Sequence, residues 1–280
     1  MLSTLKKGLK IILKQKSSAV GLILMLFLFA LILVVPFFFH LDPYKIDYDE
    51  ILEPPSFKHI FGTDHLGRDI FARVLCGGSL SLIAGFISAS TAMVLGVLLG
   101  IIAGVAGGVI DELVRSIANV LLSFPSIILA LAIVAVLGPN LSNVLLGVSI
   151  SVSPIFIRVI RGAVLTIMSS EYVLGAKALG SSRSHLIIKY IIPNTAPTII
   201  VLWTLYIPSA LISASALNFL GLGVQPPTPE WGALLNDAKN YLSTAWWTAF
   251  FPGLFICITV LSFNLLGDGL KRILDPRLKI

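Results

Sequence analysis

Side chains able to carry out catalytic or metal chemistry are few in this 280-residue chain, and they are scattered. The histidines are His40, His59, His65 and His185. His59 and His65 lie six residues apart, with no third ligand at a spacing typical of a metal site. Cys76 and Cys257 are too few and too distant for a disulfide framework. No G-x-x-x-x-G-K-[ST] phosphate loop occurs. We therefore expect no catalytic residue, metal or cofactor in this chain; a metal at the two close histidines is the alternative.

One polar stretch, EYVLGAKALGSSRSHLIIKYIIPN (171–194), lies between long apolar runs. Its first part predicts a short helix, with an acidic residue at the start, where it suits the helix dipole. Tyr172, Ala176 and Leu179 fall on one face of that helix. Gly180 is a typical residue just beyond a helix end, and a following serine can cap a second helix. We expect Pro193 to stop that second helix.

A short helix between two spans is suited to entering a groove on a soluble partner. The inner loop that contains it is about 35 residues long, and loops of that length without secondary structure are uncommon and usually functional. The alternative is an amphipathic helix that lies on the membrane surface.

The composition predicts an integral membrane protein. Hydrophobic residues make up 56% of the chain and charged residues only 12%, against about 25% charged in soluble domains. Six apolar runs are long enough to cross a bilayer: 19–39, 80–105, 117–138, 144–161, 196–217 and 249–266. The first run exceeds the length of a signal-peptide core and lacks a cleavage site, so we interpret it as a retained anchor.

The charge distribution predicts that both termini are cytoplasmic. With that orientation the inner segments hold 15 of the 20 Lys and Arg residues and 5 of the 14 acids, a net charge of +10, which leaves −4 outside. This bias is the positive-inside rule. The pI of 9.4 therefore reflects topology, and nucleic-acid binding is not expected.

These spans divide the chain into segments with different expected roles. The expected segments are a cytoplasmic start (1–18), a first span (19–39), an external segment with an interfacial helix (40–79), a core of five spans (80–270) that includes the inner polar loop (166–195) and an external loop (218–248), and a cytoplasmic tail (271–280).

The interiors of the spans are expected to lack ionisable side chains. Ion-coupled transporters usually carry such groups inside the membrane, so their absence argues against that class. Small residues, as in GVLLGIIAGVAGG (96–108), favour close helix packing. Trp231, Trp246 and Trp247 are typical of the aromatic belt at a membrane interface.

Several motifs together resemble one protein family. Ala176, Gly180 and Pro193 match the EAA loop of ABC importer permeases, whereas Leu174, Gly175, Tyr190 and Ile192 depart from it. The blocks FGTDHLGRDIFARVL (61–75), LLSFPSI (121–127), LNFLGLGVQPPTPEWG (217–232) and FNLLGDGLKRILDPRL (263–278) resemble the dipeptide, oligopeptide and nickel branch, in its second or "C" type of permease subunit.

The resemblance implies a type I ABC importer permease fold, all-α with six transmembrane helices, in a bacterial or archaeal inner membrane. It implies a related "B" type permease, two ABC ATPase subunits and an extracytoplasmic binding protein as partners, with ATP and Mg on the ATPases. The residues implied to couple to the ATPases are Glu171, Gly175, Ala176, Ala178, Leu179, Gly180 and Pro193. The external family residues are Gly62, Asp64, Gly67, Arg68, Asp69, Gly221, Gly223, Pro226, Pro227 and Trp231.

Function and cargo leave alternatives open. The external blocks could form a funnel and a seat for the binding protein, or only brace the outer helix ends. Peptides are the expected cargo, with a glutathione-like peptide, nickel or a metal chelate as alternatives. A secondary transporter and a membrane scaffold or receptor are the rival classes; the charge-poor spans and the coupling loop speak against the first, the family blocks against the second.

Overall fold

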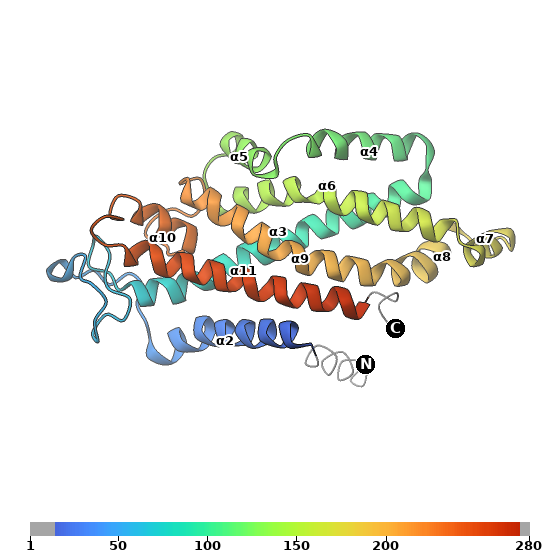
Figure 1. Ribbon diagram of the computed structural model, residues 1–280. Coiled ribbons are helices and arrows are strands. Elements are labelled where there is room, and N and C mark those ends of the chain that lie inside the picture. The colour runs from blue at the N-terminus through green and yellow to red at the C-terminus, as the bar shows by residue number, and fades with distance from the viewer. Residues whose placement is uncertain (1–14, 275–280) are drawn as a thin grey trace.

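The computed structural model describes residues 15–274, which form a bundle of long helices with small elements at both ends (Figure 1). The elements are α2 (Lys16–Phe39), η1 (Tyr48–Glu50), α3 (Ile70–Ala106), α4 (Gly108–Leu122), α5 (Ser126–Leu137), α6 (Leu141–Met168), α7 (Glu171–Ala178), α8 (Arg183–Leu186), η2 (Ile187–Ile191), α9 (Ile192–Phe219), α10 (Trp231–Ala238) and α11 (Trp247–Leu274). Within this described part, five helices are long and apolar enough to span a membrane, or six if the bent pair α4–α5 forms one span. The all-α, multi-span prediction is confirmed.

Close packing of α3 against α6 forms the centre of the bundle. A Cβ atom on Gly96 would collide with the side chain of Phe156, and one on Gly100 would lie 3.1 Å from the backbone of Arg161. Glycine at these positions removes the side chain that would hold the two backbones apart. The small residues predicted to favour helix packing therefore lie at a close helix contact.

The first span, α2, is part of the bundle. A Cβ atom on Gly21 would lie 2.7 Å from the side chain of Leu265 in α11. Ile32 is buried, and a Cβ atom on Gly78 of α3 would lie 3.0 Å from its side chain. These contacts pack α2 against α11 and α3.

The predicted third span is not a single straight helix. α4 and α5 meet at an angle of 93°. Pro125 lies in the break and has no N–H to donate, and a proline also disfavours the helical conformation of the residue before it. The sequence LLSFPSI therefore bends the chain where a continuous span was expected.

The predicted boundaries of two other helices are wrong. The "interfacial helix" of the external segment is the first part of α3, which begins at Ile70 and continues without a break into the span. Asp69 caps it by accepting a hydrogen bond from the Ala72 N–H at 2.9 Å. At the other end, the helix that contains the last predicted span (249–266) is longer than that span, because α11 runs from Trp247 to Leu274.

The expectation of charge-free spans is wrong in α6. The helix extends to Met168 and carries Arg158 and Arg161 in its inner half. Arg161 forms a two-pronged ion pair with Asp111 of α4, with one N–O distance of 2.6 Å. Arg158 donates to the Asn119 side chain at 3.3 Å. Both arginines therefore hold α4 against α6, and neither stands as an isolated charge in the bundle.

Candidate functional site

The two ends of the bundle carry different small elements. α7 and α8 project from one end, which also holds the described ends of α2 and α11 (Figure 1). The segment between α2 and α3, together with α10, lies at the opposite end. We name these the inner end and the outer end, following the orientation expected from the charge distribution.

At the inner end, two buried side chains of α7 pack it against α8. Val173 and Ala176 are buried and pack with Leu186 of α8. The prediction that Ala176 lies on one face with Tyr172 and Leu179 is therefore wrong, because those two residues are exposed. The chain reverses after α7, so the Val173 side of the helix faces α8.

The turn after α7 matches the prediction for Gly180. Its φ is +83°, which glycine adopts without the steric cost of a side chain. The Gly180 N–H donates to Lys177 O at 2.9 Å and the Ser181 N–H to Ala176 O at 3.1 Å. These two bonds form a Schellman motif, which satisfies the carbonyl groups at the helix end. Ser182 then caps α8, as expected, by accepting from the His185 N–H at 3.3 Å.

Pro193 does not stop the second helix. The chain runs through a π-helical turn, η2, directly into α9, and Pro193 lies in the first turn of α9. The Ile192 N–H donates to Ile187 O, five residues back, so the turn before the proline is wider than in an α-helix. A proline is tolerated in the first turn because its missing N–H is not required there.

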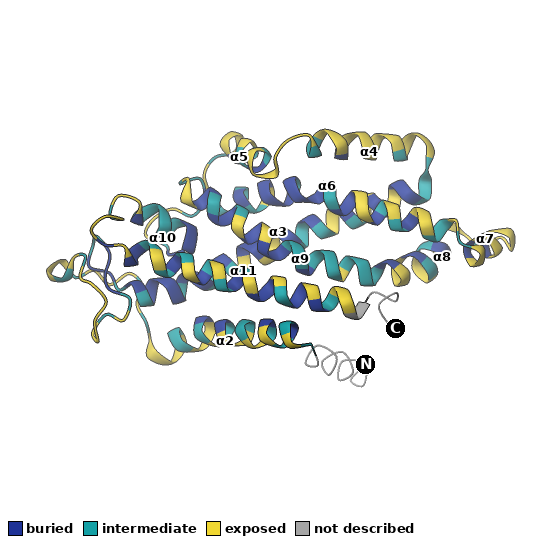
Figure 2. Ribbon diagram, in the orientation of Figure 1, coloured by how far each residue is buried: buried dark blue, intermediate teal, exposed yellow. Residues whose placement is uncertain are grey.

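The outward side of α7 is apolar and uncovered (Figure 2). Leu179 is 90% exposed, and Tyr172 and Leu174 are about half exposed. Gly175 has nothing within 4 Å of where its Cβ would lie. Glu171 and Ala178 are also exposed. The inner end thus presents a braced helix with a projecting leucine, a shape that can enter a groove.

At the outer end, a buried charge cluster joins the external segment to α10. Arg68 Nε lies 2.7 Å from Asp64 Oδ2, and Arg73 Nη2 lies 3.4 Å from Asp237 Oδ2. Arg73 Nε is 3.5 Å from the same Asp64 oxygen. Asp64, Arg68 and Arg73 are all buried. Two cations and two anions therefore balance one another; Asp237 is partly exposed, and the other three groups are buried. Such pairing is the condition for keeping buried charges ionised.

Two members of this cluster were not predicted from the sequence as site residues. Arg73 lies in a quoted motif but was not singled out, and Asp237 is separated from Asp64 by 173 positions. The residues next to a single acid in an external loop do not indicate which cation it pairs with. Asp64 and Arg68 are at the same site, as their grouping indicated.

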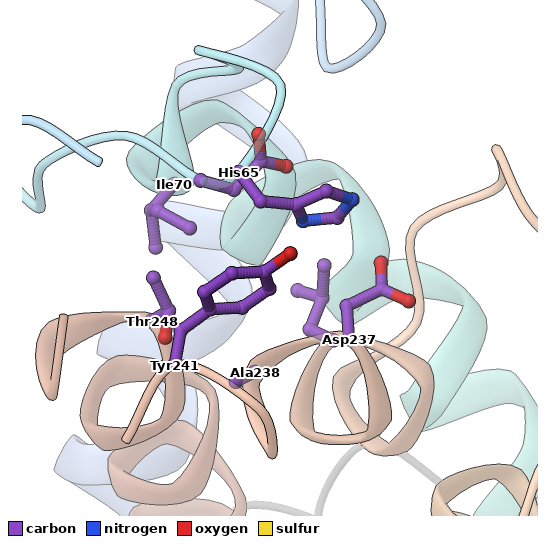
Figure 3. Close-up of a pocket in the computed structure, with 8 residues that line it drawn as sticks. His65, Ile70, Asp237, Ala238, Tyr241 and Thr248 are labelled. Atoms are coloured by element: carbon purple, nitrogen blue, oxygen red, sulfur yellow. The ribbon is translucent and has the colours of Figure 1, made fainter. Parts of the chain in front are cut away.

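A cavity of about 10 Å³, room for about one water molecule, borders this cluster (Figure 3). It is lined by Asp64, His65, Ile70, Leu234, Asp237, Ala238, Tyr241 and Thr248. The His65 ring stacks on Tyr241 at a centroid distance of 5.3 Å. His65 is therefore part of the packing between the external segment and the loop after α10.

Two glycines of the external block permit close backbone approaches. Gly62 and Gly67 have φ values of +76° and +72°. A Cβ atom on Gly67 would overlap the carbonyl group of Asp47, and one on Gly62 would lie 2.7 Å from Glu53 O and from the Trp247 ring. The block therefore folds back on itself tightly, which explains its two glycines.

His59 has both ring nitrogens in hydrogen bonds to carboxylates. Nδ1 is 2.7 Å from Asp69 Oδ2, and Nε2 is 2.7 Å from Glu50 Oε2. This arrangement leaves no nitrogen for a metal shared with His65. Within residues 15–274 no group of three or more His, Cys, Asp or Glu side chains could hold a metal ion.

The His59 contacts predict a pH dependence of the outer end. Burial opposes the charged form, but the hydrogen bonds that the ring donates to Asp69 and Glu50 raise the pKa of His59 above its ordinary value. The stabilisation by this ion cluster is complete below the unfolded-state value of about 6.5 and is lost as pH rises through the higher folded-state pKa. We expect the hydrogen-exchange protection factors of residues 48–69, which correct for the intrinsic pH dependence of exchange, to fall across that window. His59→Gln should abolish this fall; an unchanged fall in this variant would exclude the mechanism.

Trp231 and Glu230 fix α10 inside the bundle. Trp231 is fully buried and donates from Nε1 to Val74 O at 2.9 Å, so the prediction that it belongs to an interfacial belt is wrong. Glu230 caps α10 by accepting from the Ala233 N–H at 3.0 Å and accepts from Ser81 Oγ at 2.7 Å. Burial raises the pKa of its carboxyl, against these hydrogen bonds. Trp247 is also buried, whereas Trp246 is exposed.

The glycines and prolines before α10 shape the turn that leads into it. Gly221 has a φ of +79°. A Cβ atom on Gly223 would collide with the side chain of Asn218, which accepts a hydrogen bond from the Val224 N–H at 2.6 Å. Pro226 and Pro227 are exposed at the tip of the loop. The two external blocks thus brace the outer ends of α3, α9 and α11 through α10, and they also present exposed surface.

Comparison with known proteins places this arrangement in a family. The sequence profile of the binding-protein-dependent transport system inner membrane component matches residues 96–280. The chain is 41% identical over 274 residues to the dipeptide transport system permease protein DppC of Alkalihalophilus pseudofirmus, covering 98% of this chain and 90% of that protein. It is 45% identical over 258 residues to the glutathione transport system permease protein GsiD of Escherichia coli O6:K15:H31, covering 91% and 85%.

The chain therefore belongs to the binding-protein-dependent inner-membrane permeases, in the branch of the dipeptide and glutathione ABC importers. A solved structure of the MetNI methionine ABC transporter in inward-facing conformations has the same fold, with a TM-score of 0.59 at 18% identity, covering 72% of this chain and 96% of that chain. The predicted family, type I importer fold and bacterial inner-membrane location are confirmed.

Proposed function

We propose that this chain is one of two permease subunits of an ATP-driven importer for small peptides. The observation that carries the proposal is α7, a helix that projects beyond the inner end of the bundle (Figure 2) and whose C-cap residue, Leu179, is 90% exposed. A permease without a phosphate loop needs ATPase subunits elsewhere, and a projecting helix supplies a contact through which they can act.

The assembled importer contains this chain, a related "B" type permease, two ABC ATPases and an extracytoplasmic binding protein. ATP and Mg bind to the ATPases. Closure and separation of the ATPases move α7, and the permease pair opens alternately to the two sides. The residues of α7 and its turn, Glu171, Gly175, Ala178, Leu179 and Gly180, contact the ATPase, whereas Ala176 and Pro193 hold the loop in shape.

Peptides are favoured over nickel as the cargo because the named relatives transport a dipeptide and glutathione, itself a tripeptide. Within residues 15–274, the side chains that could ligate a metal are not gathered in a cluster. A peptide does not need such a cluster, because its carbonyl and amide groups bind through hydrogen bonds.

Reconstitution of the chain with and without its partners tests the proposal. The purified chain alone should hydrolyse no ATP. The complete complex should hydrolyse ATP faster when peptide-loaded binding protein is added. The proposal would be contradicted if the chain alone hydrolysed ATP and a single substitution in the chain abolished that activity.

A further inference from the structure

An open hollow of about 510 Å³ lies between the outer end of α2 and the start of α3. We name it the interface hollow. Its apolar wall consists of Val35, Phe39, Leu41, Ile60, Phe71 and Ala72. Its polar wall consists of His40, Asp42, Lys45, Lys58 and Asp69. Ligand sites measure about 300–1,000 Å³, so the hollow is large enough for a ligand that has both an apolar and a charged part.

The interface hollow lies at the membrane boundary. α2 has 24 residues and ends at Phe39, and about 20 residues are enough to cross the hydrocarbon layer. α2 lies at the edge of the bundle (Figure 1), and its last two turns expose Leu33, Val34, Phe37 and Phe38. The apolar wall of the hollow therefore continues the lipid-facing surface of α2, and the polar wall begins at the level of the lipid headgroups.

Two charged groups of the polar wall already have partners in the chain. Lys58 forms an ion pair with Glu50. Asp69 Oδ2 lies 2.7 Å from His59 Nδ1, and its other oxygen caps α3. The fold of the external segment therefore accounts for both residues without a ligand.

Asp42 and Lys45 line the same hollow without a counter-charge. Both side chains are exposed, and Asp42 Oδ1 accepts a hydrogen bond from the Tyr44 N–H at 2.8 Å. Within residues 15–274, neither of the two takes part in an ion pair, with the other or with any further residue. An acid and a base that border one hollow and do not pair are complementary to a ligand that carries both a negative and a positive group.

We propose that the interface hollow binds a phospholipid whose headgroup carries a phosphate and a primary ammonium, the phosphatidylethanolamine class. Lys45 donates to the phosphate, Asp42 accepts from the ammonium N–H groups, and the acyl chains lie along the exposed apolar side of α2. An anionic lipid satisfies Lys45 only and places its phosphate beside an unpaired carboxylate. A trimethylated amine has no N–H to donate. The proposal does not depend on the cargo.

Native mass spectrometry of the purified full chain tests the proposal. The chain would be titrated in detergent with the dioleoyl forms of phosphatidylethanolamine, phosphatidylglycerol and phosphatidylcholine. We expect phosphatidylethanolamine to bind at least about fivefold more tightly than the other two, because one charge-assisted contact at a partly exposed site is worth a factor of this order. Equal affinities for the three lipids, or a preference for phosphatidylglycerol, would overturn the proposal.

Two variants assign the contacts. Asp42→Asn keeps the acceptor for the Tyr44 N–H; it should weaken binding of phosphatidylethanolamine about fivefold and should not weaken binding of phosphatidylglycerol, because a repulsive charge is removed. Lys45→Gln should weaken binding of both lipids. Asp49→Asn and Lys239→Gln, at exposed residues that do not line the hollow, should change neither. If Asp42→Asn and Lys45→Gln bind all three lipids like the wild type, the hollow does not recognise a headgroup.

The same comparison in the assembled importer separates a lipid from a protein as the occupant. The complex that contains the wild-type chain should retain more phosphatidylethanolamine than the complex that contains Asp42→Asn. Equal retention by the two complexes, with a preference in the isolated chain, would show that another subunit covers the hollow and would overturn the proposal.

Discussion

Asp64→Ala is expected to destabilise the outer end of the protein by about 3–5 kcal/mol. The change removes the anion shared by Arg68 and Arg73, at 2.7 and 3.5 Å, and leaves two buried cations with only Asp237 between them. The same carboxylate accepts from the Leu66 and Arg68 N–H groups, so the turn at Gly67 also loses its support.

Hydrogen exchange of residues 48–75 measures this effect. A loss of 3 kcal/mol or more corresponds to a fall in protection of at least about 100-fold. Protection in Asp64→Asn should lie between that of the wild type and that of Asp64→Ala, because asparagine keeps a hydrogen-bond acceptor but not the charge. Asp49→Ala, at an exposed acid in the same segment, should cause no measurable change. Protection in Asp64→Ala equal to that of the wild type would show that the cluster contributes nothing to stability.

Leu179→Asp is expected to weaken the complex with the ATPase subunits by 2 kcal/mol or more, about 30-fold, without disturbing the fold of the chain. Leu179 is 90% exposed, so its replacement removes no internal contact. In the complex the leucine side chain would move from water into the partner's groove. A carboxylate in that apolar groove would be unfavourable.

Ala176→Glu should also prevent assembly, but for a different reason. Ala176 packs against Leu186 inside the loop, so a glutamate there places an unpaired charge in the contact that holds α7 in place. Hydrogen exchange of residues 171–192 should be fast in this variant and normal in Leu179→Asp. Leu179→Met should assemble like the wild type. Full assembly by Leu179→Asp would place α7 on the membrane surface instead.

Local signals in the sequence predicted the parts of the fold that depend on neighbouring residues. The apolar runs marked the spans, Gly180 marked the end of α7, and a serine cap marked the start of α8. Each of these depends on hydrogen bonds or on backbone conformation within a few positions, which a pattern can express.

The contacts that pair distant segments could not be predicted in this way. The inward side of α7 depends on where α8 lies, and so Ala176 was assigned to the wrong face. Trp231 is buried because α10 enters the bundle beside Val74, more than 150 positions earlier in the chain. Asp237 joins the charge cluster for the same reason. Pro193 is tolerated because the π-helical turn before it widens the helix.

Uptake of a labelled dipeptide into proteoliposomes tests the central claim most directly. The vesicles would contain this chain, the second permease and the ATPase subunits, with binding protein outside and ATP inside. We predict uptake that requires ATP and the binding protein and that does not respond to an imposed proton or sodium gradient. Uptake driven by such a gradient without ATP would show that the chain is a secondary transporter and would contradict the account.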